Sequence, residues 1–459
     1  MYILRDALGK VKKQEEKRGK FVMKKAALHN LGCKVNAYET EAMQEMLENA
    51  GYEIVPFAEG ADVYIINTCT VTNIADRKSR QMLRRARKMN PDAVVVAAGC
   101  YVQAKDGQEN DSCIDIVLGN NHKKDLIRIL EEYRSDTAVL SREERRRVTE
   151  IEDINRTHEY EELSLTKPGD HTRACIKVQD GCNQFCTYCI IPYARGRVRS
   201  RDMDDVIREV KELAANGYKE IVLTGIHLSS YGIDHDGKRH LLDLICAVHE
   251  TDGIMRIRLG SLEPGIITED FARKLSTLPK ICPHFHLSLQ SGCDATLARM
   301  NRRYTSAEYY EKCCILRRHF DAPALTTDII VGFPGETEEE FAESMSFVDK
   351  VDFYETHVFK YSKREGTKAA RMDGQIDEQT KAARSAAMIE MGKRKQKKYE
   401  QSFIGKTVEV LVEEETEIGG KLVQTGHTRE YMKIALQSNE NLKNSIIKVQ
   451  IENDSQIIR

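Results

Sequence analysis

Residues 182–189 read Cys-Asn-Gln-Phe-Cys-Thr-Tyr-Cys, and this stretch decides how the rest of the chain is interpreted. It follows an apolar run at 174–179 that is typical of a buried β-strand. Three thiolates on one short loop suit three irons of a [4Fe–4S] cube and leave the fourth iron without a protein ligand. A structural zinc site needs four ligands, and no fourth Cys or His follows at zinc-finger spacing. The stretch therefore predicts a cluster with one open position.

The region around this loop alternates strands with helices. Helical patterns separate six candidate strands, and Asn216-Gly217 ends one of these helices. The candidate strands are 174–179, 220–224, 255–259, 285–289, 327–331 and 356–361. This order predicts an incomplete, parallel (β/α)6 barrel over residues 168–400, with its active site at the carboxyl ends of the strands.

The N-terminal region predicts a second parallel sheet, of flavodoxin-like type, over residues 23–140. Candidate strands at 25–31, 61–66 and 93–98 alternate with helices at 38–49 and 74–88. A cysteine follows each of the three strands, and these are Cys33, Cys69 and Cys100. Because the carboxyl ends of parallel strands meet at one edge, the three thiols are expected to meet in space. The alternative is three small core residues.

Three further segments complete the predicted organisation. Residues 1–22 form a charged extension without an apolar signal segment, and residues 141–167 form a charged linker. Residues 401–459 alternate valine and isoleucine with polar positions, which predicts a small antiparallel β-barrel.

The composition favours a chain in a reducing, cytoplasmic compartment. The 459 residues include 13 cysteines, an odd number, and contain no apolar stretch long enough to span a membrane. The cysteines outside the two groups of three lack ligand spacing and are interpreted as core thiols. The formal net charge is only −2, so a nucleic-acid partner would need local basic patches.

The motifs resemble those of the radical S-adenosylmethionine (SAM) superfamily, and within it the methylthiotransferase family. The resemblance covers nearly the whole chain after residue 23 and is strongest to the MtaB-type branch. Its matching stretches are residues 31–36 (Leu-Gly-Cys-Lys-Val-Asn), 67–69 (Asn-Thr-Cys), 98–100 (Ala-Gly-Cys), 180–196 and 286–292 (His-Leu-Ser-Leu-Gln-Ser-Gly).

The resemblance implies two [4Fe–4S] clusters, one on Cys182, Cys186 and Cys189 and an auxiliary one on Cys33, Cys69 and Cys100. SAM would fill the open position of the first cluster. The implied reaction adds a methylthio group to C2 of N6-threonylcarbamoyladenosine at tRNA position 37. The implied partners are that tRNA, a sulfur donor and an electron donor such as flavodoxin or ferredoxin. The C-terminal segment resembles the RNA-binding TRAM domain, although acidic residues match or exceed its basic ones.

Further site residues follow from position or resemblance. The resemblance implies SAM contacts from residues near strand ends, namely Tyr188, Thr224, Gly225, Glu263, Ser288, Gln290, Ile330 and Gly332. Four arginines follow the cysteine loop and are predicted to bind RNA, because arginine suits phosphates and stacked bases: Arg195, Arg197, Arg199 and Arg201. The basic helix at 74–88 is either a second RNA contact or a solvated face.

Three functions remain open from the sequence. The first is methylthiolation of threonylcarbamoyladenosine in tRNA. The second is the same chemistry on isopentenyladenosine or on an aspartate of a ribosomal protein. The third is a non-enzymatic, metal-containing RNA-binding protein, which is disfavoured because neither cysteine set is complete as a closed structural site.

Overall fold

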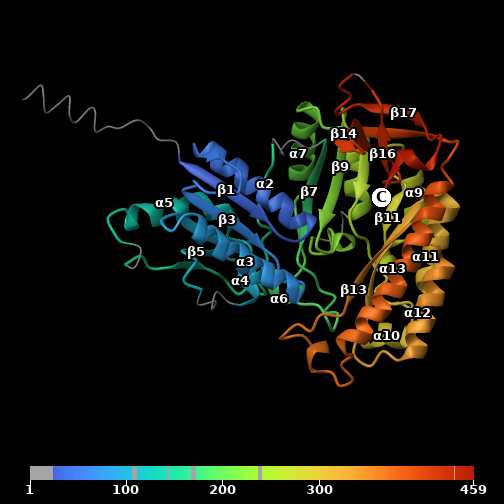
Figure 1. Cartoon of the computed structure of the whole chain (residues 1–459), viewed down its shortest axis with the longest axis horizontal. Helices are drawn as coiled ribbons and strands as arrows, with labels where there is room; N and C mark the ends of the chain where they lie inside the picture. Colours follow the sequence, from blue (N-terminus) through green and yellow to red (C-terminus); the bar gives the residue numbers. More distant parts are fainter. Residues whose placement is uncertain (1–23, 106–110, 142–143, 167–171, 236–239, 439) are drawn as a thin grey trace, which may run out of the picture.

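The computed structural model describes residues 24–105, 111–141, 144–166, 172–235, 240–438 and 440–459. The predicted extension at 1–22 lies outside these ranges. Figure 1 shows an N-terminal α/β unit in blue and teal beside a larger α/β unit in green to orange, with a small β unit in red. Among the described residues, no helix combines the length and apolar character that crossing a bilayer requires.

The N-terminal unit is a six-stranded parallel sheet with the strand order β2-β1-β3-β4-β5-β6. Its strands are β1 (Lys25–Asn30), β2 (Glu53–Ile54), β3 (Val63–Thr68), β4 (Val94–Gly99), β5 (Ile116–Leu118) and β6 (Val148–Glu150). Its helices are α2 (Lys34–Asn49), α3 (Asn73–Met89), α4 (Cys100–Ala104) and α5 (Leu126–Thr137). Side chains of α2 and α5 pack on one face, and those of α3 and α4 on the other. The central strands β3 and β4 are buried throughout, as expected between two helical layers.

One part of the predicted linker belongs to this sheet. Strand β6 comes from the segment 141–167, and its residues Val148, Thr149 and Glu150 pair in parallel with β5. The prediction of a plain linker was wrong there, because charged side chains gave no apolar signal for an edge strand whose stability comes from backbone pairing.

The larger unit is a curled half-barrel of six parallel strands. Its strands are β7 (Arg173–Asp180), β9 (Glu220–Gly225), β10 (Arg256–Leu259), β11 (His284–His286), β12 (Ala324–Val331) and β13 (Glu355–Lys360). Isolated parallel bridges join the β7-β9-β10 part to the β11-β12-β13 part. The short strand β8 (Arg199–Ser200) runs antiparallel to β7.

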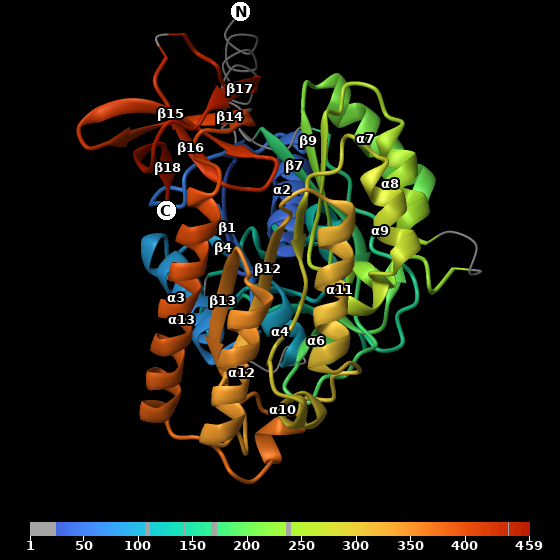
Figure 2. The ribbon, with the colours of Figure 1, turned by 90° about the vertical axis from the view of Figure 1, so that its right-hand side faces the viewer.

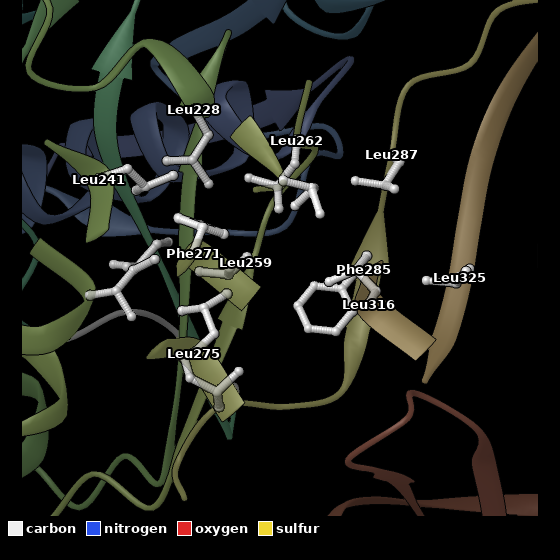
Figure 3. Packing of buried hydrophobic residues seen from close by; sticks show 14 of the residues in the cluster. Leu228, Leu241, Leu259, Leu262, Phe271, Leu275, Phe285, Leu287, Leu316 and Leu325 are labelled. Atoms are coloured by element: carbon white, nitrogen blue, oxygen red, sulfur yellow. The ribbon is translucent and has the colours of Figure 1, made fainter. Parts of the chain in front are cut away.

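Helices cover the outside of the half-barrel. They are α7 (Met203–Ala215), α8 (Leu241–His249), α9 (Glu269–Ser276), α11 (Ser306–His319), α12 (Glu338–Val351) and α13 (Glu378–Gln401). Two shorter helices are α6 (Ile191–Arg195), which contacts α4 of the N-terminal unit, and α10 (Asp294–Arg299), which precedes α11. Figure 3 shows leucine and phenylalanine side chains from the strands and from the surrounding helices meeting in one apolar core. This packing fixes the strand ends from which the site residues project.

The C-terminal unit is an antiparallel sheet with the order β17-β14-β15-β16-β18. Its strands are β14 (Thr407–Ile418), β15 (Lys421–Thr428), β16 (Lys433–Leu436), β17 (Ile446–Gln450) and β18 (Ile457–Ile458). The predicted antiparallel character is confirmed, and closure into a barrel stays a prediction.

The C-terminal sheet contacts the amino ends of the barrel strands. The Tyr431 ring lies 5.0 Å from the Arg173 guanidinium and 4.7 Å from that of Arg258. Arg256 donates hydrogen bonds to the carbonyls of His427 and Glu409. The C-terminal sheet therefore lies at the end of the barrel opposite the cysteine loop, as Figure 2 shows for the red unit.

Candidate active site

The three N-terminal cysteines lie at one edge of their sheet. Cys33 is the N-cap of α2, Cys69 directly follows β3, and Cys100 directly follows β4 and begins α4. Gly32 has a φ of +111°, and a Cβ there would lie 3.0 Å from the Cys69 sulfur. The loops of Cys33 and Cys69 are therefore in contact, and the predicted convergence of three strand ends is what the structure shows. We call these three residues the N-terminal thiol set.

The N-terminal thiol set fits a cationic iron cluster. Burial, together with the neighbouring sulfurs of Cys100 and Cys33, raises the pKa of the Cys69 thiol to about 11. Three thiolates so close together repel one another unless a metal compensates their charge. Protein-bound iron supplies that charge, and thiolates are its usual ligands in [4Fe–4S] clusters.

The second group is held on one loop after β7, and we call Cys182, Cys186 and Cys189 the barrel thiol set. Burial raises the pKa of Cys182 to about 11 and that of Cys189 to about 12, with the sulfur of Cys186 adding to both shifts. The backbone N–H of Cys189 donates to the Cys186 carbonyl at 3.0 Å. The loop thus brings three thiols together locally, and the same charge argument favours an iron cluster there.

Each thiol set accepts a hydrogen bond from an arginine whose side chain is largely buried. Nε of Arg195 lies 3.2 Å from the sulfur of Cys100, and Nη1 of Arg302 lies 3.3 Å from the sulfur of Cys186. A guanidinium beside a sulfur stabilises the thiolate form through a charge-assisted hydrogen bond. Sequence reasoning missed Arg302, because its proximity to Cys186 depends on the curvature of the barrel.

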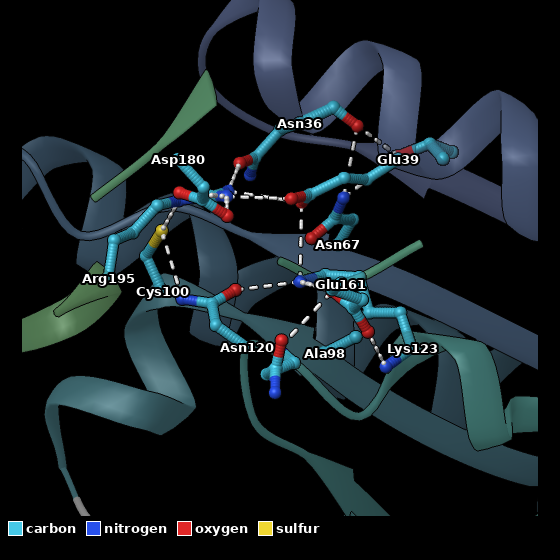
Figure 4. Close-up of polar contacts among 12 residues, drawn as sticks. Asn36, Glu39, Asn67, Ala98, Cys100, Asn120, Lys123, Glu161, Asp180 and Arg195 are labelled. Carbon is cyan, nitrogen blue, oxygen red and sulfur yellow. Dashed lines mark hydrogen bonds and ion pairs between the residues drawn. The ribbon is translucent and has the colours of Figure 1, made fainter. Parts of the chain in front are cut away.

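Arg195 also belongs to a buried ionic network between the two α/β units (Figure 4). Its guanidinium pairs with Glu39 on α2 at 2.6 Å and with Asp180 at the end of β7 at 3.1 Å. Burial alone would raise the pKa of Glu39, but Arg195, Lys123 and Lys177 hold it well below its usual range. The network therefore keeps its charges and joins the N-terminal unit to the barrel.

Asn36 extends this network to the other two N-terminal cysteine loops. Its side-chain oxygen accepts from Nη2 of Arg195 at 2.6 Å. Its amide nitrogen donates to the carbonyls of Leu31 at 2.7 Å and Thr68 at 3.0 Å, which precede Cys33 and Cys69. Arg195 and Asn36 together thus contact all three loops of the N-terminal thiol set.

A cavity of about 250 Å³ lies between the two α/β units. Val71 and Thr72, just after Cys69, line it from the N-terminal unit, and Cys189 lines it from the barrel loop. The remaining lining residues are Tyr188, Ile190, Ile191, Gln290, Asp328, Ile330, Phe359, Lys360, Tyr361 and Ser362. Loops from both thiol sets therefore border the same cavity.

Three of the eight predicted SAM residues line this cavity, and they are Tyr188, Gln290 and Ile330. Thr224 and Gly225 end β9, and Gly332 follows β12. Ser288 offers its carbonyl to the Tyr304 hydroxyl at 2.6 Å. The placement at carboxyl ends of strands is as expected, and contact with SAM stays a prediction for all eight.

Glu263, another predicted SAM residue, contacts an arginine and a histidine side chain. It pairs with Arg302 and lies 3.6 Å from Nε2 of His227. Burial would raise the pKa of Glu263, but the hydrogen bond from His227 and the charge of Arg302 lower it. Glu263 is therefore an ionised partner for Arg302 beside Cys186.

The prediction of four RNA-binding arginines was wrong for three of them. Arg195, Arg199 and Arg201 are at most 5 % exposed, and Arg201 pairs with Glu209 on α7. Only Arg197 is exposed. The alternating spacing suggested one face, but α6 ends at Arg195 and Gly196 turns the chain with a φ of +71°. Carboxylates of α2, β7 and α7 then pair with the buried guanidinium groups.

The basic helix is the observed α3, and it is both a structural element and an exposed basic face. Arg87 pairs with Asp115, and Arg84 lies 3.1 Å from Asp111. Arg77, Lys78, Arg85 and Lys88 point to the exposed side. An RNA contact from this helix stays a prediction.

Comparisons with known proteins decide the family. The model of the "Radical SAM superfamily" matches residues 176–348, and that of "Uncharacterized protein family UPF0004" matches residues 25–119. A protein of Bacillus subtilis (strain 168) named threonylcarbamoyladenosine tRNA methylthiotransferase MtaB is 42 % identical over 94 % of both chains. The chain belongs to the MtaB-type methylthiotransferase family. Another MtaB, of Aquifex aeolicus, is 40 % identical over 86 % of this chain and 94 % of its own.

Other relatives of this MtaB-type chain differ in their named product or share only the fold. A tRNA-2-methylthio-N(6)-dimethylallyladenosine synthase of Acetivibrio thermocellus is 34 % identical over 96 % of this chain and 90 % of its own. The solved radical SAM methyltransferase TsrM of Kitasatospora setae has a TM-score of 0.53 at 18 % identity, covering 74 % of this chain and 75 % of its own. The MtaB-type family uses SAM and [4Fe–4S] clusters, which the thiol sets fit.

Proposed function

We propose that the chain catalyses methylthiolation at C2 of N6-threonylcarbamoyladenosine at position 37 of tRNA. The observation that carries the proposal is a cavity bordered by loops from both thiol sets. The names of relatives that are 42 % and 40 % identical support the choice of substrate.

Each of the two α/β units supplies the ligands for one of the two proposed clusters. The barrel thiol set would hold one [4Fe–4S] cluster and the N-terminal thiol set the auxiliary one. When bound, the two clusters supply the electron that cleaves SAM and the sulfur that is transferred. Arg302 and Arg195 hold Cys186 and Cys100 by hydrogen bonds, and the network around Glu39 fixes the two loops relative to each other. The C2–H bond of adenine has no useful acidity, so no general base is assigned.

The cavity residues would bind and orient the two substrates. Tyr188, Gln290 and Ile330 are proposed to contact SAM, since they lie beside Cys189. The target adenine would enter between them and Val71 and Thr72, which follow Cys69. The partners proposed from the family are the tRNA, an electron donor such as flavodoxin or ferredoxin, and a sulfur donor.

The test uses anaerobically reconstituted protein with SAM, a reductant and two anticodon stem–loop RNAs. One RNA carries threonylcarbamoyladenosine and the other carries isopentenyladenosine at position 37. Mass spectrometry of the nucleosides is expected to show the methylthio product from the first RNA alone. Product from the second RNA alone would overturn the proposal in favour of the activity named for the 34 % identical relative.

A further inference from the structure

Three side chains form a partly exposed cation–aromatic group on the cysteine loop and on the segment that follows it. The rings of Phe185 and Tyr193 meet edge to face, with centroids 6.0 Å apart. The guanidinium of Arg197 lies over the Phe185 ring at 4.5 Å from its centroid. Tyr193 is 46 % exposed, and Arg197 is exposed as well. An exposed group of this kind offers both flat apolar surface and a delocalised positive charge.

The backbone under this group is held tightly to the barrel cysteine loop. Gly181 has a φ of +69°, and a Cβ there would lie 1.8 Å from the carbonyl oxygen of Arg197. The N–H of Cys182 donates to the Gly196 carbonyl at 3.0 Å, and that of Val198 donates to the Asn183 side chain at 3.3 Å. Arg197 is therefore fixed in position by the loop that carries the barrel thiol set.

Phe185 sits in a backbone conformation that a bulky residue rarely adopts. Its φ is +49°, in the left-handed region, and its carbonyl accepts from the side chain of Asn301 at 3.1 Å. Such strain persists only where the surrounding structure enforces it, and it concentrates at functional sites. The aromatic group is thus preorganised on a rigid support, which reduces the entropic cost of binding a flat ligand.

The position of the group indicates which ligand it meets. Helix α6 carries Tyr193 and begins at Ile191, which lines the cavity. Val71 and Phe359, 48 % and 47 % exposed, add apolar surface to the cavity lining. Among the described residues, Arg197 forms no ion pair with a carboxylate, unlike Arg195 and Arg201.

We infer that Phe185, Tyr193 and Arg197 form a stacking platform for an unpaired nucleotide adjacent to the modified adenosine. The inference rests on the proposed RNA substrate. An adenosine that enters the cavity leaves the base stack, and its neighbours lose a stacking partner. Proteins that recognise unpaired RNA replace that partner with aromatic rings and arginine planes.

The test measures binding of an anticodon stem–loop in which 2-aminopurine replaces the nucleotide on either side of position 37. Stacking on the platform is expected to quench its fluorescence with the wild-type holoprotein. Tyr193→Ala is expected to weaken binding about 5- to 150-fold and to remove the quenching, since base–aromatic stacking is of that strength. Tyr193→Phe retains the ring and is expected to behave as wild type.

Substitution of Arg197 measures the contribution of its charge to RNA binding separately from that of the aromatic rings. Arg197→Gln is expected to weaken binding of the RNA. It is also expected to reduce the slope of log affinity against log salt concentration by about 0.7, because one contact between the guanidinium and a phosphate is lost. The matched control is Arg208→Gln, another exposed arginine, on α7 and paired with Asp205, which is expected to change neither quantity. Iron content and visible absorption of each variant report that the cluster loop is intact.

Two outcomes overturn the inference, and they are distinguishable. If the wild type modifies the RNA but Tyr193→Ala and Arg197→Gln bind with unchanged affinity and quenching, the platform is wrong and the proposed function stands. If the wild type neither binds nor modifies the RNA, the proposed function fails and the platform fails with it.

Discussion

The two thiol sets reach similar chemistry by different routes. The barrel thiol set lies within the stretch 182–189 on one loop. The N-terminal thiol set is collected from the ends of β1, β3 and β4, and its members meet only after the parallel sheet has formed. A local motif holds its ligands close even before the chain folds, whereas a site spread over strand ends depends on the register of the whole sheet.

The supporting arginines show a second asymmetry. Arg302, which contacts Cys186, belongs to the barrel itself, whereas Arg195 crosses from the barrel to Cys100 in the N-terminal unit. The barrel thiol set is therefore complete within its own unit. The N-terminal thiol set is completed by a residue of its neighbour, so its properties depend on how the two units are docked.

The largest expected effect separates the two sets outright. Cys186→Ala is expected to abolish both SAM cleavage and product, and Cys69→Ala to abolish product while SAM cleavage continues. Each variant is expected to retain about four of eight irons per chain, because one [4Fe–4S] cluster remains. Iron analysis and deoxyadenosine release measure the two quantities. If Cys69→Ala still formed product, the assignment of an auxiliary cluster to the N-terminal thiol set would be wrong. Cys246→Ala, which removes a thiol outside both sets, is the control.

The next effect tests whether docking depends on Arg195. Arg195→Met leaves Glu39 and Asp180 with fewer cationic partners in a buried site, which is expected to lower the free energy of unfolding by about 3–5 kcal/mol. Chemical denaturation of the holoprotein measures it. The matched control is Arg197, an exposed arginine two residues further along the chain. Arg197→Met is expected to change the free energy of unfolding by less than about 0.5 kcal/mol. Equal losses from both variants would contradict the buried network.

A smaller effect concerns the electronic properties of each site. Arg302→Gln removes the positive charge next to Cys186, so the reduction potential of the cluster on the barrel thiol set is expected to fall by about 60–130 mV. A charge-assisted hydrogen bond contributes about 1.5–3 kcal/mol, and about 59 mV corresponds to 1.4 kcal/mol for one electron. Redox titration followed by electron paramagnetic resonance checks this. The other cluster serves as the internal reference, and a shift of both potentials would argue against a local cause.

The smallest effect is confined to the support of the barrel loop. The hydroxyl of Thr187 donates to the carbonyl of Arg299 at 2.9 Å. Thr187→Val removes this hydrogen bond while keeping the shape, which is expected to cost about 1 kcal/mol of the free energy of unfolding. Thermal unfolding compared with Thr187→Ser, which keeps the hydroxyl, measures the difference. Indistinguishable variants would show that this bond does not stabilise the loop.

The observed ends of α2 and β3 differ from the ends that the apolar pattern of the sequence predicts. The apolar pattern predicts a first helix over 38–49, but α2 begins at Lys34. Its first turn carries Asn36, whose buried amide serves the cysteine loops instead of an apolar core. The strand predicted at 61–66 is observed as Val63–Thr68, because backbone pairing with β4 continues through polar residues. Polar residues that act at a site hide the periodicity on which sequence reasoning depends.

The sequence alone determined the strand–helix alternation, the barrel thiol set and the expectation that three strand-end cysteines meet, because periodicity and spacing are local properties. Only the tertiary structure decided that Arg195, Arg199 and Arg201 are buried, that Arg302 reaches Cys186, and that one cavity borders both sets. These features depend on side chains that other elements bring close, as Glu39 is brought to Arg195 and Arg302 to Cys186. An arginine pattern on its own carries no information about which acidic residues folding will place beside it.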